Sequence, residues 1–195
     1  MDVSTMGVGS HIYSIYRNLE EQFLITFPIL AKGLSENDKC LYIADLNLED
    51  RVKQEYRSYL DSEQLEFIDN KIYLENGLLN INKLISSFDV SLQKAEDDGY
   101  NNLRVAGELP FIDGKTIDND KVVEYEALVD KFITSKNIIA VCSYDENKYS
   151  PDFLTKIIKS HQYVAIYGRC YKNIFYNSSS CPKEYRETIQ KLIEV

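Results

Sequence analysis

The sequence has few of the features that announce a specific class of protein. It contains no tryptophan, two histidines and four cysteines, which are Cys40, Cys142, Cys170 and Cys181. The cysteines form no C-x-x-C pair, and three of them lie in or beside apolar runs. This pattern is typical of reduced cytosolic thiols and argues against a disulfide framework and a cysteine-rich zinc site.

Long hydrophobic runs and basic clusters are also missing. No apolar run approaches the roughly 18 residues of a membrane-spanning helix, and the first residues lack a basic, hydrophobic leader. The chain has 22 basic and 31 acidic residues, a net charge of −9. We therefore expect a cytoplasmic protein that binds neither nucleic acid nor a membrane directly. Its 195 residues, with 44% apolar and 27% charged residues, are typical of one soluble domain.

Motifs of common enzymes are absent too. A phosphate-binding loop after the first expected strand would read G-x-x-x-x-G-K-[ST], but the connection there is Tyr16–Glu20, and the first lysine is Lys32. Gly107–Thr116 ends in Gly-Lys-Thr, but six residues separate its glycines where four are needed, and Pro110 lacks an amide hydrogen. No G-x-S-x-G segment is present either, so a serine hydrolase has no support.

The order of apolar segments predicts the fold. Short apolar runs alternate along the chain with helical stripes, which indicates a three-layer α/β domain around a mostly parallel sheet. The expected strands are Ser10–Tyr16, Cys40–Ala44, Leu65–Ile68, Leu103–Ala106, Ile138–Val141, Tyr163–Tyr167 and an edge strand near Asn173–Tyr176. The expected helices lie near 19–34, 48–59, 81–99, 122–133 and 154–158. One domain, residues 1–176, precedes a C-terminal segment, residues 177–195, with a helix from about Pro182.

One strand is the best candidate for carrying a site. Ile138–Val141 is continuously apolar, as in a strand buried on both faces, and it runs into Cys142, Ser143, Tyr144 and Asp145. Ligands of open α/β sheets bind outside the carboxyl ends of the strands, where such side chains are displayed. A core strand that simply continues into a polar loop is the alternative, and the spacing does not decide between the two.

Two charged residues stand at positions that should be buried. Arg104 lies within an apolar strand, and Glu126 interrupts the apolar stripe of its helix, one turn after Val122. A buried charge needs a partner. We therefore predict an ion pair between Arg104 and Glu126 or Glu108, with a role in packing alone as the alternative.

The two histidines do not define a site by themselves. His11 begins the first strand, and His161 ends a helix, where a histidine is usually a cap that interacts with the helix dipole. With Cys142 they could form a metal site in principle, but their spacing does not support one. We expect no metal and no cofactor.

An ordered set of short motifs extends from about Gly9 to Tyr176. Its members are Gly9-Ser10-His11-Ile12 with Tyr16, Gly33-Leu34, Cys40-Leu41-Tyr42-Ile43, Gly99-Tyr100, Leu103-Arg104-Val105-Ala106-Gly107-Glu108, Tyr125-Glu126-Ala127, Val141-Cys142-Ser143-Tyr144-Asp145, His161, and Asn173 with Phe175-Tyr176. This set resembles the MEDS domain, the methanogen/methylotroph DcmR sensory domain.

The resemblance implies a RecA-like or KaiC-like α/β fold that has lost its phosphate-binding loop. It also implies a sensor of small hydrocarbon derivatives, of the kind joined to histidine kinase, DNA-binding or other signalling modules. The motif positions carried over are His11, Tyr16, Arg104, Glu108, Glu126, Cys142, Tyr144, Asp145 and His161. Two departures from the family pattern bear on the ligand. Leu109-Pro110-Phe111 stands where family members often have an aromatic-rich segment that contains tryptophan, and Gln162 stands in place of the usual proline.

We therefore expect a non-enzymatic, ligand-sensing domain that binds a small organic molecule and signals to an output partner. Tyr16, Cys142 and Tyr144 are predicted to line its pocket at the carboxyl ends of the strands. His11, Glu108 and Asp145 are its predicted polar groups, whereas Arg104, Glu126 and His161 are predicted to support it. The terminal helix is a candidate relay or homodimer contact.

Two other functions are kept as alternatives. One is a degenerate nucleoside triphosphatase that binds nucleotide through Lys115 and Thr116. The other is a structural interaction module without a ligand.

Overall fold

A seven-stranded sheet forms the centre of the computed structural model, which describes residues 1–45, 54, 63–109 and 119–177. The strand order is β3-β2-β6-β7-β1-β8-β9, and all neighbours are parallel except β8 and β9. The strands are β1 (His11–Tyr16), β2 (Lys39–Ala44), β3 (Leu65–Asp69), β6 (Leu103–Glu108), β7 (Ile138–Asp145), β8 (Tyr163–Ile166) and β9 (Arg169–Lys172). The predicted mostly parallel α/β sheet is thus confirmed.

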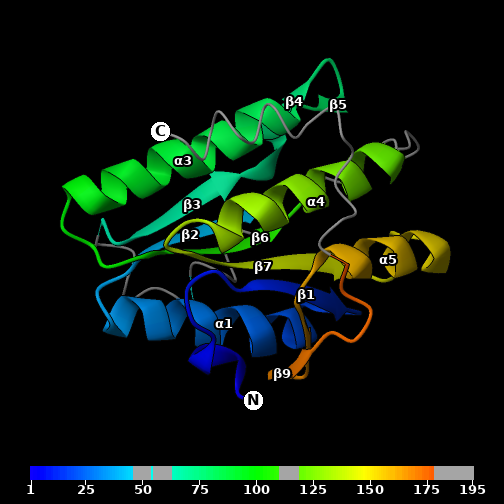
Figure 1. Ribbon diagram of the computed structural model, residues 1–195, viewed down its shortest axis with the longest axis horizontal. Helices are drawn as coiled ribbons and strands as arrows, with labels where there is room; N and C mark the ends of the chain where they lie inside the picture. The colour runs from blue at the N-terminus through cyan, green and yellow to red at the C-terminus, as the bar shows by residue number, and fades with distance from the viewer. Residues whose placement is uncertain (46–53, 55–62, 110–118, 178–195) are drawn as a thin grey trace.

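Helices cover both faces of this sheet and complete three layers (Figure 1). α3 (Ile81–Asp97) and α4 (Asn119–Thr134) lie on one face, and α1 (Leu19–Ser35) lies on the other. α5 (Pro151–Ile157) packs beside α4. Asn18, Asn80 and Ser150 begin three of these helices, because each side chain accepts a hydrogen bond from an amide of the first turn. Shorter elements are η1 (Val3–Thr5), η4 (Asn70–Tyr73), η5 (Ile158–Ser160) and the hairpin of β4 (Leu74–Glu75) and β5 (Leu78–Leu79).

β7 is buried on both faces, as its uninterrupted apolar run predicts. Ile138 and Ala140 pack into the core under α3 and α4, whereas Ile139 and Val141 belong to the core next to α1. Because side chains alternate along a strand, Cys142 then points to the same side as Ala140, toward α4.

The buried charge of β6 has partners other than those predicted. Arg104 Nε donates to Asp38 Oδ2 at 2.5 Å, and Nη2 donates to Glu36 Oε2 at 2.8 Å. The predicted pairing with Glu126 or Glu108 is wrong. Arg104 faces α1, whereas Glu126 lies on α4, across the sheet. Glu108 is four residues further along β6, about 13 Å away at about 3.3 Å per residue.

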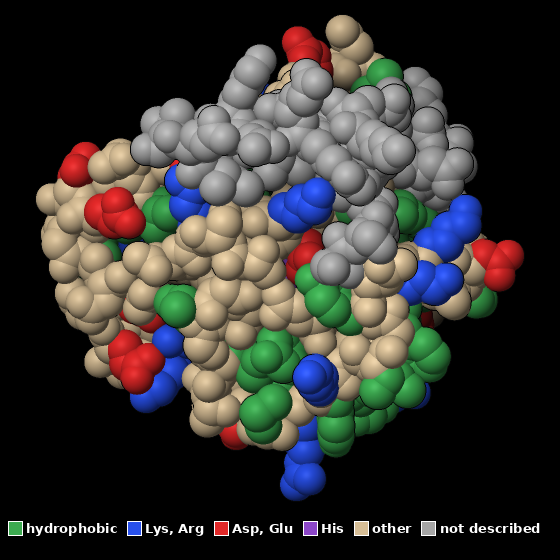
Figure 2. Space-filling model, viewed as in Figure 1, with side chains coloured by type: hydrophobic (Ala, Val, Ile, Leu, Met, Phe, Trp, Pro, Cys, Tyr) green, Lys and Arg blue, Asp and Glu red, His purple; other side chains and the backbone are tan. Residues whose placement is uncertain are grey.

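The edge strand also differs from the prediction. It is β9, not residues 173–176, which form a turn. Tyr167 and Gly168 both have positive φ and close a two-residue hairpin, so the chain folds back directly after β8. Figure 2 shows hydrophobic side chains on the lower part of the face drawn, where Figure 1 places β9. The exposed large apolar residues of this hairpin and of the turn after it are Ile166, Tyr167, Tyr171, Ile174 and Phe175.

Three predicted features lie outside the described residues: most of the helix at 48–59, the Lys115-Thr116 segment and the terminal helix from Pro182. Within the described ranges, no helix is both long and apolar enough to cross a membrane.

Candidate functional site

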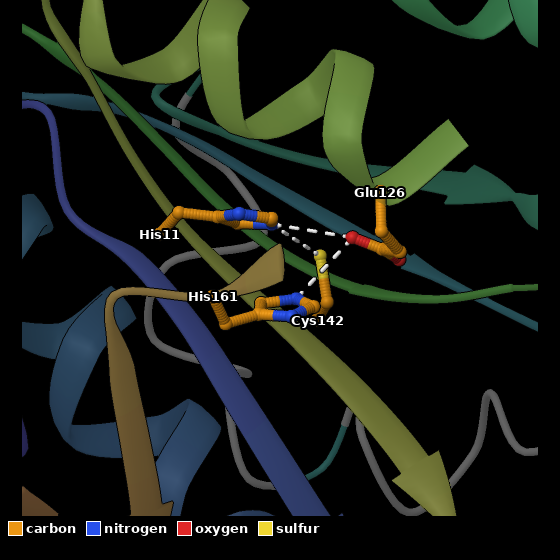
Figure 3. Close-up of side chains that lie close together, drawn as sticks. All are labelled: His11, Glu126, Cys142 and His161. Carbon is orange, nitrogen blue, oxygen red and sulfur yellow. Dashed lines mark hydrogen bonds and ion pairs between the residues drawn. The ribbon is translucent and has the colours of Figure 1, made fainter. Parts of the chain in front are cut away.

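Four ionisable side chains from separate elements meet under α4. They are His11 of β1, Glu126 of α4, Cys142 of β7 and His161, which follows η5 (Figure 3). One nitrogen, sulfur or oxygen atom from each residue lies within 4.8 Å of the others. We call these four residues the buried cluster.

The sheet topology explains how residues far apart in sequence form this cluster. β1 and β7 are parallel neighbours in which His11 pairs with Ala140, so His11 lies two residues before the level of Cys142 and on the same face. Glu126 follows Val122 by one helical turn and therefore faces the sheet with it. α5 and η5 pack against α4 and lead the chain to His161.

The polar atoms of the cluster are in close contact. Glu126 Oε2 lies 3.3 Å from His11 Nε2 and 3.2 Å from His161 Nε2. Cys142 Sγ lies 3.4 Å from His11 Nε2, and the two imidazole rings stack with their centroids 3.9 Å apart. Both histidines and Glu126 are fully buried, and no histidine is visible on the face drawn in Figure 2.

The far side of each imidazole ring is held by oxygen acceptors. His11 Nδ1 lies 3.3 Å from both the Ser160 carbonyl oxygen and Asp130 Oδ1, and His161 Nδ1 lies 3.0 Å from the Ile157 carbonyl oxygen. Carbonyl oxygens only accept hydrogen bonds, so Nδ1 carries the hydrogen in both rings. The Nε2 atom of each ring is thereby directed at Glu126.

Burial and mutual charge set the protonation of the cluster. Burial opposes a charge on His11, but the acidic groups around it raise its pKa well above the ordinary value. Burial and the charge of His11 lower the pKa of His161. Burial alone would raise the pKa of Glu126, but the two histidines hold that pKa well below its usual range. Burial raises the pKa of the Cys142 thiol to about 11, and the charge of Glu126 contributes to this rise.

Asp130 extends the cluster and is the residue that the sequence reasoning missed. It lies four residues after Glu126, on the same side of α4, and this spacing could have identified it. Cys142, His11 and Asp130 stand in the order of a nucleophile, its base and an orienting carboxylate. A nucleophilic cysteine has a lowered pKa, however, and that of Cys142 is raised.

An apolar cavity adjoins the cluster, between the sheet and helices α3 and α4. Glu126 and Cys142 belong to both, and Tyr144, which also lines the cavity, donates its hydroxyl hydrogen to Glu126 Oε1. The volume of this cavity, measured as the space that the centre of a water-sized sphere can occupy, is about 30 Å³. The apolar wall includes Ile43, Leu84, Phe88, Val105, Val129 and Ala140.

A second, open groove lies at the carboxyl ends of the strands. Its walls include the carboxylates of Asp45, Glu108 and Asp145, together with Tyr16. Lys71 Nζ lies 2.9 Å from Asp45 Oδ1. The groove is thus more polar and more acidic than the cavity.

The predicted site residues divide between these places. Tyr16 and Asp145 line the groove, Cys142 and Tyr144 line the cavity, and Glu108 borders both while its carboxylate accepts a hydrogen bond from Gln22. Glu126 belongs to both the cavity wall and the buried cluster, His11 and His161 lie in the buried cluster, and Arg104 lies against α1.

Comparison with known proteins gives one positive result. The family model MEDS, the MEthanogen/methylotroph, DcmR Sensory domain, matches residues 10–162. No curated protein is significantly similar to the chain. The matched range begins just before β1, includes all four cluster residues and reaches the start of β8. Because it covers well over half of the sequence, the chain belongs to the MEDS family of sensory domains.

Proposed function

We propose that this chain is a non-enzymatic sensory domain that binds a small, mostly apolar organic molecule in the cavity beside Cys142. The observation that carries the proposal is the cavity itself. Its wall is largely apolar, and a few polar side chains, among them Glu126, Cys142 and Tyr144, converge on one part of it. Small-molecule sites in proteins combine these two properties.

The size of the cavity restricts the ligand. One water molecule needs about 10–15 Å³ on the same measure, so about 30 Å³ accommodates two or three non-hydrogen atoms without rearrangement. The best small ligands gain at most about 1.5 kcal/mol per such atom, hence about 4.5 kcal/mol for three. This corresponds to a Kd of about 0.5 mM or weaker. We therefore expect a compound of two or three non-hydrogen atoms, sensed at millimolar concentration.

The signal is proposed to pass through α4. This helix contributes Tyr125, Glu126 and Val129 to the cavity wall and packs against β7, α3 and α5. A ligand that binds two arrangements of α4 unequally would shift their populations and so report its presence to an output partner. The free thiols of Cys40, Cys142 and Cys170 support a reducing, cytoplasmic setting for this work.

The test is a thermal-stability measurement with about 50 mM of alcohols, aldehydes and halogenated alkanes that have two or three non-hydrogen atoms, with acetone and propanol as larger comparison compounds. A ligand at 100 times its Kd stabilises the native state by about 2.7 kcal/mol. Xenon, followed by NMR, is a second probe of the apolar cavity that does not depend on the choice of compound. Stabilisation by magnesium-ATP and by none of these compounds would favour the nucleotide-binding alternative instead.

A matched pair of variants locates the response. Ala140→Val extends a cavity-lining side chain, whereas Ala106→Val makes the same change on β6, in the core of the opposite face. We expect Ala140→Val to weaken ligand and xenon binding at least tenfold and Ala106→Val to leave both unchanged. Binding that survives Ala140→Val would show that the ligand lies elsewhere.

A further inference from the structure

The buried cluster has the composition and geometry of a metal centre. We propose that His11, Glu126, Cys142 and His161 bind one zinc ion, or a divalent transition-metal ion with the same ligand preference. This site goes beyond the sensing of an organic molecule and does not depend on it. It also replaces our expectation from the sequence, in which the spacing of His11, Cys142 and His161 did not support a metal and Glu126 was assigned a supporting role.

The distances between the polar atoms suit a tetrahedral ion. Bonds of about 2.0–2.1 Å to nitrogen and oxygen and about 2.3 Å to sulfur separate neighbouring ligand atoms by about 3.3–3.6 Å. Three pairs in the cluster are 3.2, 3.3 and 3.4 Å apart, and all four ligand atoms lie within 4.8 Å of one another. An ion can thus bind after small side-chain movements, without rearrangement of the strands.

Two buried atoms of the cluster point at each other without a hydrogen bond. Among the described residues, Glu126 Oε2 and His161 Nε2 have no hydrogen-bond partner, although they lie 3.2 Å apart. The hydrogen of the His161 ring is on Nδ1, which faces the Ile157 carbonyl oxygen, so the lone pair of Nε2 faces a carboxylate oxygen. His11 Nε2 lies 3.3 Å from the same carboxylate oxygen and compensates part of its charge, but the lone pair of His161 Nε2 still faces a carboxylate. Burial of these two acceptors is costly, and a cation between them removes the cost.

The groups around the cluster hold the proposed ligands as they are held in known metal centres. A ligating histidine usually donates its second ring hydrogen to a carbonyl or carboxylate oxygen, which orients the ring. Ser160 and Asp130 do this for His11, and Ile157 does it for His161. The carboxylate has an equivalent support, because Tyr144 donates to the oxygen of Glu126 that does not face the histidines.

The types of ligand select the ion. Imidazole and thiolate favour zinc and its neighbours in the transition series, whereas magnesium and calcium prefer a shell made only of oxygen. On binding, the Cys142 thiol forms a sulfur–metal bond and releases its proton to solvent, and a proton on His11 Nε2 is released in the same way. Two imidazoles, one thiolate and one carboxylate then give a neutral zinc complex, which suits a fully buried position.

The experiment uses the full chain without an affinity tag, stripped with EDTA and titrated separately with Zn²⁺ and Co²⁺. We expect one equivalent of either ion to bind and the Co²⁺ complex to show the near-ultraviolet band of a sulfur–cobalt bond. Cys142→Ser should abolish that band and weaken zinc binding at least tenfold, and His161→Gln should weaken zinc binding similarly. Cys170→Ser is the matched control, because Cys170 is a buried thiol outside the cluster, and it should behave as the wild type.

Each outcome decides the proposal. Zinc bound at well below one equivalent by folded wild-type protein would overturn it, as would a cobalt complex without the sulfur band. If Cys142→Ser does not fold, the wild-type cobalt spectrum decides alone. Metal binding with no response to any organic compound would retain this site and reject the proposed sensing function, and the reverse result would do the opposite.

Discussion

Two groups of buried charges lie on opposite faces of the same sheet, and they differ in what they leave unpaired. Against α1, the guanidinium of Arg104 lies between the carboxylates of Asp38 and Glu36, and Asn102 donates a further hydrogen bond to Asp38. Under α4, the buried cluster directs two imidazole nitrogens and a thiol at one carboxylate.

The unpaired atoms show the difference. We call Arg104, Asp38, Glu36 and Asn102 the arginine group. Its atom without a hydrogen-bond partner among the described residues is Arg104 Nη1, a donor that any acceptor could satisfy. In the cluster, the atoms without a hydrogen bond to any described residue are Glu126 Oε2 and His161 Nε2, two acceptors that face each other, although Oε2 also forms an ion pair with His11 Nε2. An ion pair is stable without a further group, whereas two lone pairs that face each other are stabilised when a cation binds between them. The arginine group is therefore the structural one, and the cluster is the functional candidate.

The strongest way to test this contrast is to remove the fully buried partner of the arginine. Asp38→Asn keeps the shape of the side chain but leaves Arg104, among the described residues, with the half-exposed Glu36 as its ion-pair partner. Removal of one member of a buried ion pair costs about 3–5 kcal/mol, because the remaining charge is uncompensated. We expect a loss of this size in the free energy of unfolding, measured with urea.

A double variant provides the control for that measurement. Asp38→Asn with Arg104→Met removes both charges and should regain most of the lost stability, because an apolar replacement of a buried ion pair is often neutral. If Asp38→Asn alone costs less than about 1 kcal/mol, water reaches the guanidinium and the description of a closed pair is wrong.

The packing of the arginine group can be tested at Gly33 of α1. Alanine usually stabilises a helix interior by about 0.5–1 kcal/mol relative to glycine. A Cβ atom on Gly33, however, would lie 2.5 Å from Arg104 Cδ and 2.8 Å from Cys40 Sγ. We expect Gly33→Ala to destabilise the protein by about 1–3 kcal/mol in thermal or urea unfolding, as overpacking does. A stabilised variant would mean that the arginine stem can move aside.

A hydroxyl deletion tests the other face. Tyr144→Phe removes the donor to Glu126 Oε1 and leaves a buried carboxylate oxygen unpaired. We expect a loss of about 1–3 kcal/mol in EDTA, where no metal compensates. Tyr73→Phe is the control, since that hydroxyl shares a neutral hydrogen bond with Ser87 Oγ, at 3.0 Å. Equal losses in the two variants would contradict a special role for the carboxylate.

The contrast between the two groups also separates what the sequence could predict from what it could not. The buried positions of Arg104 and Glu126 follow from the periods of β6 and α4, and both charges do have partners. The predicted pairing of Arg104 with Glu126 was wrong, because the hydrophobic periodicity shows only which residues share one face of a single helix or strand. It does not fix which of several helices covers that face.

The composition of the cluster was out of reach for the same reason. His11 and Cys142 are brought together by the adjacency of β1 and β7, which are first and fifth among the strands of the main sheet in chain order. No local pattern encodes the order of parallel strands. The edge strand was also misplaced in the prediction. The turn at Tyr167-Gly168 places β9 immediately after β8, whereas the prediction assigned the strand to the apolar residues near 173–176.

The smallest effect on stability is expected from Glu36, the half-exposed carboxylate of the arginine group. Glu36 also accepts a hydrogen bond from Arg104, but its side chain is 44% exposed and pairs with Lys32 as well. Solvent screens such a pair, and its loss leaves Arg104 with Asp38, so we expect Glu36→Gln to leave the urea midpoint unchanged within error. A loss comparable to that of Asp38→Asn would mean that the two carboxylates act as one unit. The buried contact alone would then no longer explain the stability of the group.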